Sequence, residues 1–401
     1  MSKPLDSAAP TTTQPRLVWQ VGVASLSRLC LNTARRFAYP FAPALSRGLG
    51  VPLAAVTPLI AVNQITSVLA LFFGPLGDRW GYRIMLLGGM ASLALGMLVA
   101  GFMPAYTTVL VALFLAGLGK SLFDPAIQAY VGRKVPYERR GMVIGIMEIA
   151  WAGSSLVGIP FVGLLMARFG WRAPFFVLGA AGLLGLLVLA VLIPRNAEHF
   201  SPPTSSMNVR KAWRHLAHNR RALGTLGFAF FVSVANDNFF VVYGAWLEGT
   251  FGLSVVAVGI ATTVIGVAEL AGEGLTAALS DRMGLQRAVF IGLMLSILSY
   301  LALPWLGYTL PLALTALFFV FLTLEFSIVT TLSISTEVLP EARATMMAGY
   351  LSAAGIGRVV GALIGGPLWV AGGMMTTALA STVISCFALI SFWQGLRGWR
   401  P

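Results

Sequence analysis

Charged side chains interrupt several long apolar stretches of this sequence. Moving a charge from water into hydrocarbon costs several kcal/mol, so each should line a water-filled cavity or pair with an opposite charge. Five of these side chains are bases and six are acids. They are Arg28, Arg35, Arg36, Lys120, Asp124, Glu148, Asp237, Glu269, Glu273, Glu325 and Arg358.

The first apolar stretch carries a basic face of four polar residues. The last three follow the first by four, seven and eight positions, which places all four on one side of a helix. They are Arg28, Asn32, Arg35 and Arg36. Guanidinium groups bind carboxylates and phosphates, so this face is a candidate site for an anionic substrate or a lipid headgroup. The alternative is pairing with Asp124, which itself follows Lys120 by four residues, although one acid cannot neutralise four bases.

We predict substrate contact for this basic face and for four further polar residues that cluster in later apolar stretches. These four are Lys120, Asp124, Asp237 and Glu325. The intramembrane charges of the first half sum to +2 and those of the second half to −3. Either the halves attract each other across a cavity, or the cavity suits an amphiphilic or zwitterionic solute.

Acids are the candidates for carrying a coupling proton, since burial of a carboxylate favours its neutral form. No histidine lies in an apolar stretch. The five candidates are Glu148, Asp237, Glu269, Glu273 and Glu325. The alternative is that an acid is a structural partner of Arg358 or of the arginines in the first apolar stretch. A sodium site at Asn236–Asn238 is a weaker alternative, because nothing completes its oxygen shell.

The sequence offers no arrangement for catalysis, a metal or a cofactor. Gly119-Lys120-Ser121 resembles the end of a phosphate-binding loop, but that loop needs glycine at position 114, which is Phe114. Cys30 and Cys386 both fall inside apolar stretches. We therefore expect a protein that is not an enzyme and has neither a metal site nor a cofactor.

The composition is that of a polytopic membrane protein. The 401 residues are 57% hydrophobic and 10% charged, whereas a soluble protein carries about 25% charged residues. A helix needs about 20 apolar residues to span a bilayer. The sequence thus predicts an all-α protein with twelve spans, near residues 18–45, 53–74, 84–104, 107–131, 142–167, 172–193, 222–247, 254–279, 288–306, 310–337, 345–370 and 374–395.

Basic residues set the predicted orientation. Nineteen of the 27 Lys and Arg residues fall on one side of the predicted spans and three on the other. This asymmetry places both termini in the cytoplasm. The net charge of +13 is therefore a topology signal and not evidence for a nucleic-acid partner.

The longest polar stretch divides the spans into two sets of six. We predict a cytoplasmic N-terminal tail (residues 1–17) and a cytoplasmic C-terminal tail (396–401). Between them lie a first six-helix bundle (18–193), a cytoplasmic linker (194–221) and a second six-helix bundle (222–395).

A charged segment, which we expect to form a short turn between two apolar runs, recurs at half the chain length. Gly74–Arg83 reads GPLGDRWGYR, and Leu279–Gly284 keeps its Leu, Asp, Arg and Gly at an offset of 203 residues. A second marker, Pro136–Gly141, recurs in weaker form after Leu339 at an offset of 204. Two markers at nearly one offset indicate a duplicated, parallel repeat.

With these features the chain resembles the major facilitator superfamily, whose signature between helices 2 and 3 matches Gly74–Arg83. The resemblance implies two pseudo-symmetric six-helix bundles, with helices 1, 4, 7 and 10 around a central cavity. It also implies that the repeated segments latch the bundles in one state; the alternative is a loop that only sets topology. The latch residues would be Gly74, Gly77, Asp78, Arg79, Gly81, Arg83, Asp281, Arg282 and Gly284.

Within that family the chain resembles the branch of bacterial drug and metabolite antiporters, with departures. Ile159 interrupts the glycine-proline pair of the antiporter motif in span 5, and Leu113 replaces an expected arginine in span 4.

We expect proton-coupled efflux of a small organic, amphiphilic or anionic compound by alternating access. The protein would work as a monomer in the inner membrane of a bacterial cell, with the substrate, protons and membrane lipids as partners. The alternatives are a proton-linked importer or an uncoupled facilitator of an organic acid or metabolite. From another class, the alternative is a non-transporting membrane receptor or a lipid-handling protein on the same fold.

Overall fold

The computed structural model describes residues 14–134, 143, 147–194, 209–339 and 343–398. Within its helices, the side chains of residues 14–16, 70–80, 129, 132–133, 209–213 and 343–344 are not described.

Helices make up nearly all of the described chain. The first bundle contains α1 (Gln14–Arg36), α2 (Ala42–Leu49), α3 (Leu53–Trp80), α4 (Tyr82–Phe102), α5 (Tyr106–Lys134), the π-helix η1 (Ser154–Gly158), α7 (Ile159–Phe169) and α8 (Ala173–Leu192). The second contains α10 (Arg220–Phe240), α11 (Tyr243–Phe251), α12 (Val255–Ala261), α13 (Thr263–Met283), α14 (Leu285–Leu306), α15 (Leu310–Val338) and α16 (Arg343–Leu396). The short helix α9 (Val209–His218) precedes α10.

The helix lengths are consistent with the predicted twelve spans. Nine described helices are long and apolar enough to cross a membrane, and the bent pair of α2 and the first part of α3 makes a tenth. The stretch Thr345–Leu396 is long enough for two crossings and breaks at Gly372 and Gly373, between the two predicted spans. The remaining predicted span is α1, whose mean hydropathy is lowered by its basic residues.

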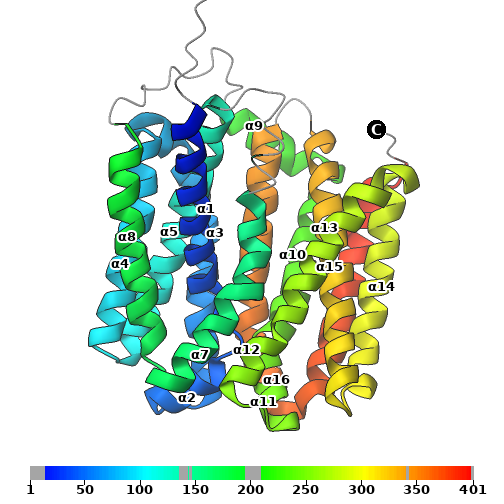
Figure 1. Ribbon diagram of the computed structural model, residues 1–401. Helices are drawn as coiled ribbons and strands as arrows, with labels where there is room; N and C mark the ends of the chain where they lie inside the picture. The colour runs from blue at the N-terminus through cyan, green and yellow to red at the C-terminus, as the bar shows by residue number, and fades with distance from the viewer. Residues whose placement is uncertain (1–13, 135–142, 144–146, 195–208, 340–342, 399–401) are drawn as a thin grey trace, which may run out of the picture.

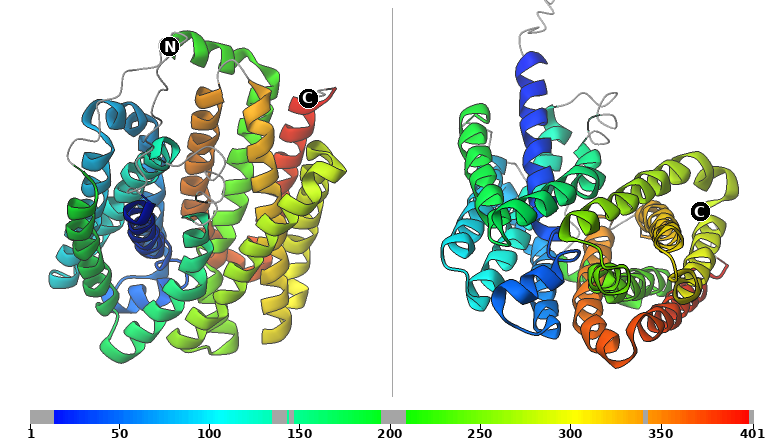
Figure 2. Two further views of the ribbon diagram at one scale, coloured as in Figure 1. Left: turned by 45° about the horizontal axis from the view of Figure 1, so that its top comes forward. Right: turned by 60° about the horizontal axis from the view of Figure 1, so that its bottom comes forward.

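The two bundles lie side by side (Figures 1 and 2). In Figure 1, α1 begins and α16 ends at the top, where α9 also lies, while α2 and α11 lie at the bottom. We call these the terminal end and the α2–α11 end. On α8 the apolar side chains Leu184, Leu187 and Val191 are exposed, as expected for a surface that faces lipid chains.

Helix α1 ends a few residues before Pro40 and Pro43. The α-helix stops at Arg36, and a turn over residues 37–41 leads into α2, which has Pro43 in its first turn. Helices α2 and α3 then meet at an angle of 114°. The predicted span 18–45 is therefore shorter at its end, because proline removes a backbone donor.

The repeated charged segments are mostly helical and are not the short turns that the sequence suggested. Helix α3 continues to Trp80, and the chain leaves it only at Gly81, with φ of 86°. In the second copy α13 continues to Met283 and ends at Gly284, with φ of 82°. Both positions use a positive φ that favours glycine, so the repeat is visible in the backbone. The structure does not describe the surroundings of residues 70–80, so the predicted latch residues Gly74, Gly77, Asp78 and Arg79 lie outside its described side chains.

Contacts between the bundles run from the middle of the helices to the α2–α11 end. At six described glycines, an added Cβ atom would lie within 3.3 Å of an atom in the other bundle. These pairs are Gly163 with Val255, Gly244 with Pro40, Gly259 with Pro160, Gly266 with Ser155, Gly355 with Ser67, and Gly366 with Thr57. The absence of a side chain at each glycine permits this close approach.

Candidate functional site

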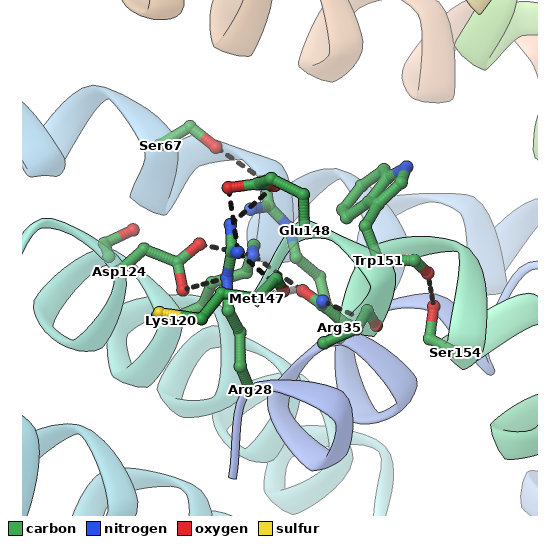
Figure 3. Close-up of polar contacts among 12 residues, drawn as sticks. Arg28, Arg35, Ser67, Lys120, Asp124, Met147, Glu148, Trp151 and Ser154 are labelled. Carbon is green, nitrogen blue, oxygen red and sulfur yellow. Dashed lines mark hydrogen bonds and ion pairs between the residues drawn. The ribbon is translucent and has the colours of Figure 1, made fainter. Parts of the chain in front are cut away.

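A charged network fills the interior of the first bundle. The Arg28 guanidinium donates to both carboxylate oxygens of Glu148, at 2.9 and 3.0 Å, and to the Oδ1 atom of Asp124 at 3.2 Å (Figure 3). The Met147 carbonyl accepts a further bond from it at 2.9 Å. Arg28 is thus shared between an acid of α5 and an acid of the segment that leads into η1.

Lys120 completes this network from α5. Its ammonium group forms an ion pair with Asp124, one helical turn away, and donates to the Oδ1 atom of Asn32 at 2.6 Å. The Asn32 amide in turn donates to the Ala150 carbonyl at 3.1 Å. Two bases and two acids therefore neutralise one another within the first bundle, and Asn32 ties them to α1.

A second ion pair joins the two bundles. The Arg36 guanidinium donates to both oxygens of Glu269 in α13, at 2.6 and 3.2 Å. The side chains of both residues are 4% exposed. Arg36 also lies over the Trp151 ring, 4.4 Å from its centroid. The buried, bidentate geometry is the strong form of this interaction.

The π-helix η1 supplies hydroxyl groups to this pair. Ser154 and Ser155 are both fully buried in η1. The Arg36 Nη1 atom contacts the Ser154 hydroxyl at 3.4 Å, and the Ser155 hydroxyl donates to Glu269 at 3.3 Å. A single π-turn inside a longer helix is often found at functional sites. Here it places two consecutive hydroxyls against one ion pair.

A third group of polar side chains crosses between the bundles near the first two. Arg35 donates to the amide oxygen of Gln64, whose nitrogen donates to the Tyr39 hydroxyl at 2.7 Å. The Tyr39 hydroxyl donates to Asp237 of α10 at 2.6 Å, and the other oxygen of Asp237 lies 4.0 Å from Arg358 Nε. The chain of contacts therefore begins and ends with an arginine.

Two further acids, Glu273 and Glu325, lie beside the Arg36–Glu269 pair. Among the described residues, neither Glu273 nor Glu325 has a basic nitrogen within ion-pairing distance. Glu325 packs against Gly272, where an added Cβ atom would lie 2.8 Å from its own Cβ. It therefore faces the turn of α13 that bears Glu269 and Glu273.

The structure thus brings most of the predicted site residues into contact, in three groups. The first group holds Arg28, Asn32, Lys120, Asp124 and Glu148; the second holds Arg36 and Glu269; the third holds Arg35 and Asp237. Glu273 and Glu325 lie beside the second group. The predicted alternative, that several acids pair with helix-1 arginines, describes this geometry for Asp124, Glu148 and Glu269.

Several uncharged side chains that belong to these three groups were not singled out from the sequence. They are Tyr39, Gln64, Ser67, Trp151, Ser154 and Ser155. Gln64 and Ser67 lie three residues apart in an otherwise apolar span, which was a detectable signal. In the part of the chain that the structure describes, no cluster of His, Cys, Asp and Glu side chains has the geometry to hold a metal ion.

Comparison with known sequences gives one family. The family model described as Major Facilitator Superfamily matches residues 24–362 and, again, residues 226–398. The second, overlapping match falls on the second bundle.

Relatives from bacteria have transporter names. The Bacillus subtilis protein named "Uncharacterized MFS-type transporter YceJ" is 27% identical over 303 residues, covering 76% of this chain and 77% of its own. The Escherichia coli protein "Uncharacterized transporter YgaY" is 26% identical and covers 90% of this chain and 91% of its own. "Multidrug resistance protein MdtG" of Salmonella arizonae is 26% identical over 60% of this chain and 61% of its own.

Solved structures share the fold. A bacterial homologue of the human lysosomal transporter Spinster, in an inward-facing conformation, has a TM-score of 0.78 at 16% identity. The match covers 97% of this chain and 99% of that one. A POT family transporter has a TM-score of 0.76 at 16% identity, covering 92% of this chain and 94% of its own.

Proposed function

Because the chain belongs to the major facilitator superfamily, a family of integral membrane transporters, we propose that it exports a small organic compound in exchange for protons. One relative is named for multidrug resistance, which favours export over import. The protein would lie in the inner membrane of a bacterial cell as a monomer. The distribution of basic residues supports cytoplasmic termini.

Alternating access is the proposed mechanism of movement. The named contacts between the bundles lie between the middle of the helices and the α2–α11 end. They are supported at that end by an ion pair between Arg47 of α2 and Glu248 of α11. This pattern supports a state that is closed at the α2–α11 end. Opening that end requires the bundles to rock apart and the Arg36–Glu269 pair to separate.

The observation that carries proton coupling is the position of Glu325. It has no ion pair among the described residues, and the charged groups around it are Glu269, Glu273, Arg36 and Arg358. A proton on Glu325 removes a negative charge next to Glu269 and Glu273. Loss of that proton allows Glu325 to compete with Glu269 for Arg36. In this proposal, the proton thereby decides how firmly the bundles are joined.

The repeated charged segments are proposed as the latch at the terminal end. Asp78 is its first candidate, since a carboxylate can accept hydrogen bonds from the N-terminus of a neighbouring helix or form an ion pair with an arginine. Replacing Asp78 with Asn is expected to reduce exchange while membrane insertion stays intact. Exchange at the wild-type rate would contradict the latch.

The test of proton exchange uses inverted membrane vesicles from cells that express the protein. Respiration acidifies the vesicle interior, and an acridine dye reports the pH gradient. Cationic, neutral and anionic amphiphiles are then added in turn. We expect at least one of them to discharge the gradient in vesicles with the protein and not in vesicles without it.

Variants separate coupling from assembly. Glu325→Gln is expected to abolish solute-driven discharge, whereas Glu337→Gln, the same change at an exposed position of the same helix, is expected to retain it. If no solute discharges the gradient, or if Glu325→Gln discharges it normally, the proposed coupling is wrong.

A further inference from the structure

Arg35 is a buried cation with no carboxylate partner among the residues that the structure describes. The residue is 6% exposed. Its hydrogen bonds go to uncharged oxygens, the Gln64 amide and, at 2.6 Å, the Ser67 hydroxyl (Figure 3). Its Nε has no hydrogen-bond partner in the described part of the chain. A buried charge without a counter-ion is strongly unfavourable, so this site is incomplete without an anion.

The other bases in the first bundle's interior are already neutralised. Arg28 is paired with Asp124 and Glu148, and Lys120 is paired with Asp124. Arg36 is paired with Glu269. Arg35 is therefore distinguished from its neighbours on α1 by its surroundings, although the sequence gives all three arginines the same chemistry.

A second arginine approaches Arg35 from the opposite bundle. Arg358 of α16 is connected to Arg35 by a chain of polar contacts through Gln64, Tyr39 and Asp237. One turn before it, Gly355 packs against Ser67, the residue whose hydroxyl accepts from Arg35. The partner of Arg358 is Asp237, at 4.0 Å, which is the outer limit of an ion pair. Asp237 also accepts a 2.6 Å bond from Tyr39, so its charge is shared.

We propose that Arg35 and Arg358 together bind the acidic group of the transported compound, which makes the substrate an organic anion. Gln64 and Ser67 would supply neutral hydrogen-bonding groups around the same acidic group. One guanidinium comes from each bundle, so the bound anion would join the bundles across their interface. This assignment rests on the proposed transport function and deepens it.

Two cations suit a carboxylate, a sulfonate or a phosphate monoester, because guanidinium groups match the planar or tetrahedral oxygens of such groups. An anionic lipid headgroup presents the same chemistry. The site lies in the interior of the bundles, between α1, α3 and α16, and this favours a freely diffusing solute over a lipid.

The test measures ligand stabilisation of the purified full chain at constant ionic strength. The probes are hexanoate, benzenesulfonate and phenyl phosphate, beside the uncharged hexanamide, benzenesulfonamide and phenol. A ligand that binds the folded state raises the melting temperature by mass action. We expect at least one anion to raise it more than its uncharged analogue does. Failure of all three anions would overturn the assignment.

Variants locate the binding. Arg35→Gln and Arg358→Gln should each weaken the affinity for the stabilising anion by at least about tenfold, the scale expected when a buried charged partner is removed. Arg287→Gln, at an exposed position of α14, should leave the affinity unchanged. An unchanged affinity in both interior variants would show that the anion binds elsewhere. If Arg35→Gln does not fold, Arg358→Gln alone decides.

Two further outcomes separate this assignment from its rivals. Dihexanoyl phosphatidylglycerol is tested at the same concentrations. Stabilisation by this lipid alone would assign the site to a lipid headgroup and would refute the proposal that it binds a transported anion. If a cation or a neutral solute drives proton exchange in vesicles while the anions leave the melting temperature unchanged, the proposed export stands and the anion site is wrong.

Discussion

Among the residues that the structure describes, two ion pairs join the bundles, and their burial sets how much each contributes to stability. The side chains of Arg36 and Glu269 are 4% exposed, whereas those of Arg47 and Glu248 are 58% and 27% exposed. Removing one partner of a buried pair leaves an uncompensated charge, which costs about 3–5 kcal/mol. An exposed pair contributes roughly 0–1 kcal/mol, because water screens it.

Replacing one member of the buried pair is therefore expected to destabilise the protein strongly. Glu269→Gln and Arg36→Gln should each lower the free energy of unfolding by about 3 kcal/mol or more. The double variant should lose less than the sum, because neither charge is then left alone. Thermal denaturation in detergent measures all three.

Arg47→Gln and Glu248→Gln are the matched controls, since they interrupt an exposed pair between the same two bundles. Each should change stability by less than about 1 kcal/mol. Equal losses from the two pairs would contradict the idea that burial decides their contribution.

Within the first bundle, the two acids that share Arg28 are not equivalent. Asp124 contacts two cations and its side chain is 19% exposed, whereas Glu148 contacts only Arg28 and its side chain is 40% exposed. Asp124→Asn should therefore destabilise the protein by about 2–4 kcal/mol, and Glu148→Gln by about 1 kcal/mol. A reversed order in thermal denaturation would refute this ranking.

The sequence predicted which charged residues gather in the interior and offered acid–arginine pairing as an alternative, but it did not predict which acid pairs with which arginine. Arg28, Arg35 and Arg36 carry the same group on one face, yet they have different partners on three other helices. Pairing depends on how the helices pack, between residues that lie from 29 to 233 positions apart in the chain, and spacing along α1 does not encode this packing. Gln64 was missed because an amide in an apolar span is a weaker signal than a charge.

At the scale of the elements, α11 contains two glycines in opposite surroundings. A Cβ atom on Gly244 would collide with the Pro40 carbonyl of the first bundle, whereas no atom lies within 4 Å of the corresponding position at Gly249. Gly244→Ala should destabilise this closed end by about 1–3 kcal/mol through overpacking. Gly249→Ala should be neutral or stabilise by up to about 1 kcal/mol, because alanine favours helices.

The comparison isolates contact between the bundles from helix propensity, because both changes lie in one helix. Thermal denaturation of the two variants, each against the wild type, is the measurement. Stabilisation by Gly244→Ala, or a similar loss at both sites, would contradict the close approach of α11 to Pro40.

Element positions were predictable to the extent that the membrane dictates them. A span needs a fixed apolar length, so the break of α16 at Gly372 and Gly373 fell between two predicted spans. The charged segment after span 2 was less predictable. Its polar residues suggested a turn, but α3 stays helical to Trp80, because a helix can extend beyond the apolar region while satisfying its own backbone.

At the scale of the whole molecule, the duplication seen in the sequence is matched by paired helix ends. Gly81 and Gly284 both end a helix with a positive φ, 203 residues apart. In the proposed alternating access, two similar halves that meet along one interface rock about it, so the same contacts would form and break during transport. A covalent bond across the interface should therefore stop the cycle.

The interface offers a suitable site for such a bond in α7 and α12. A Cβ atom at Gly163 would lie 3.6 Å from the Gly259 Cα atom, within the reach of a disulfide. In a background with Cys30→Ser and Cys386→Ser, the double variant Gly163→Cys/Gly259→Cys should lose solute-driven proton exchange on oxidation and regain it on reduction. Exchange in the vesicle assay is the measurement.

The control places the same bond within one bundle. A Cβ atom at Gly182 of α8 would lie 3.3 Å from the Ala94 Cβ of α4. Ala94→Cys/Gly182→Cys should form a disulfide and keep its exchange activity, because both helices belong to one rigid half. Full exchange by the oxidised Gly163/Gly259 variant, with the disulfide verified by mass spectrometry, would rule out transport that requires the α2–α11 end to open.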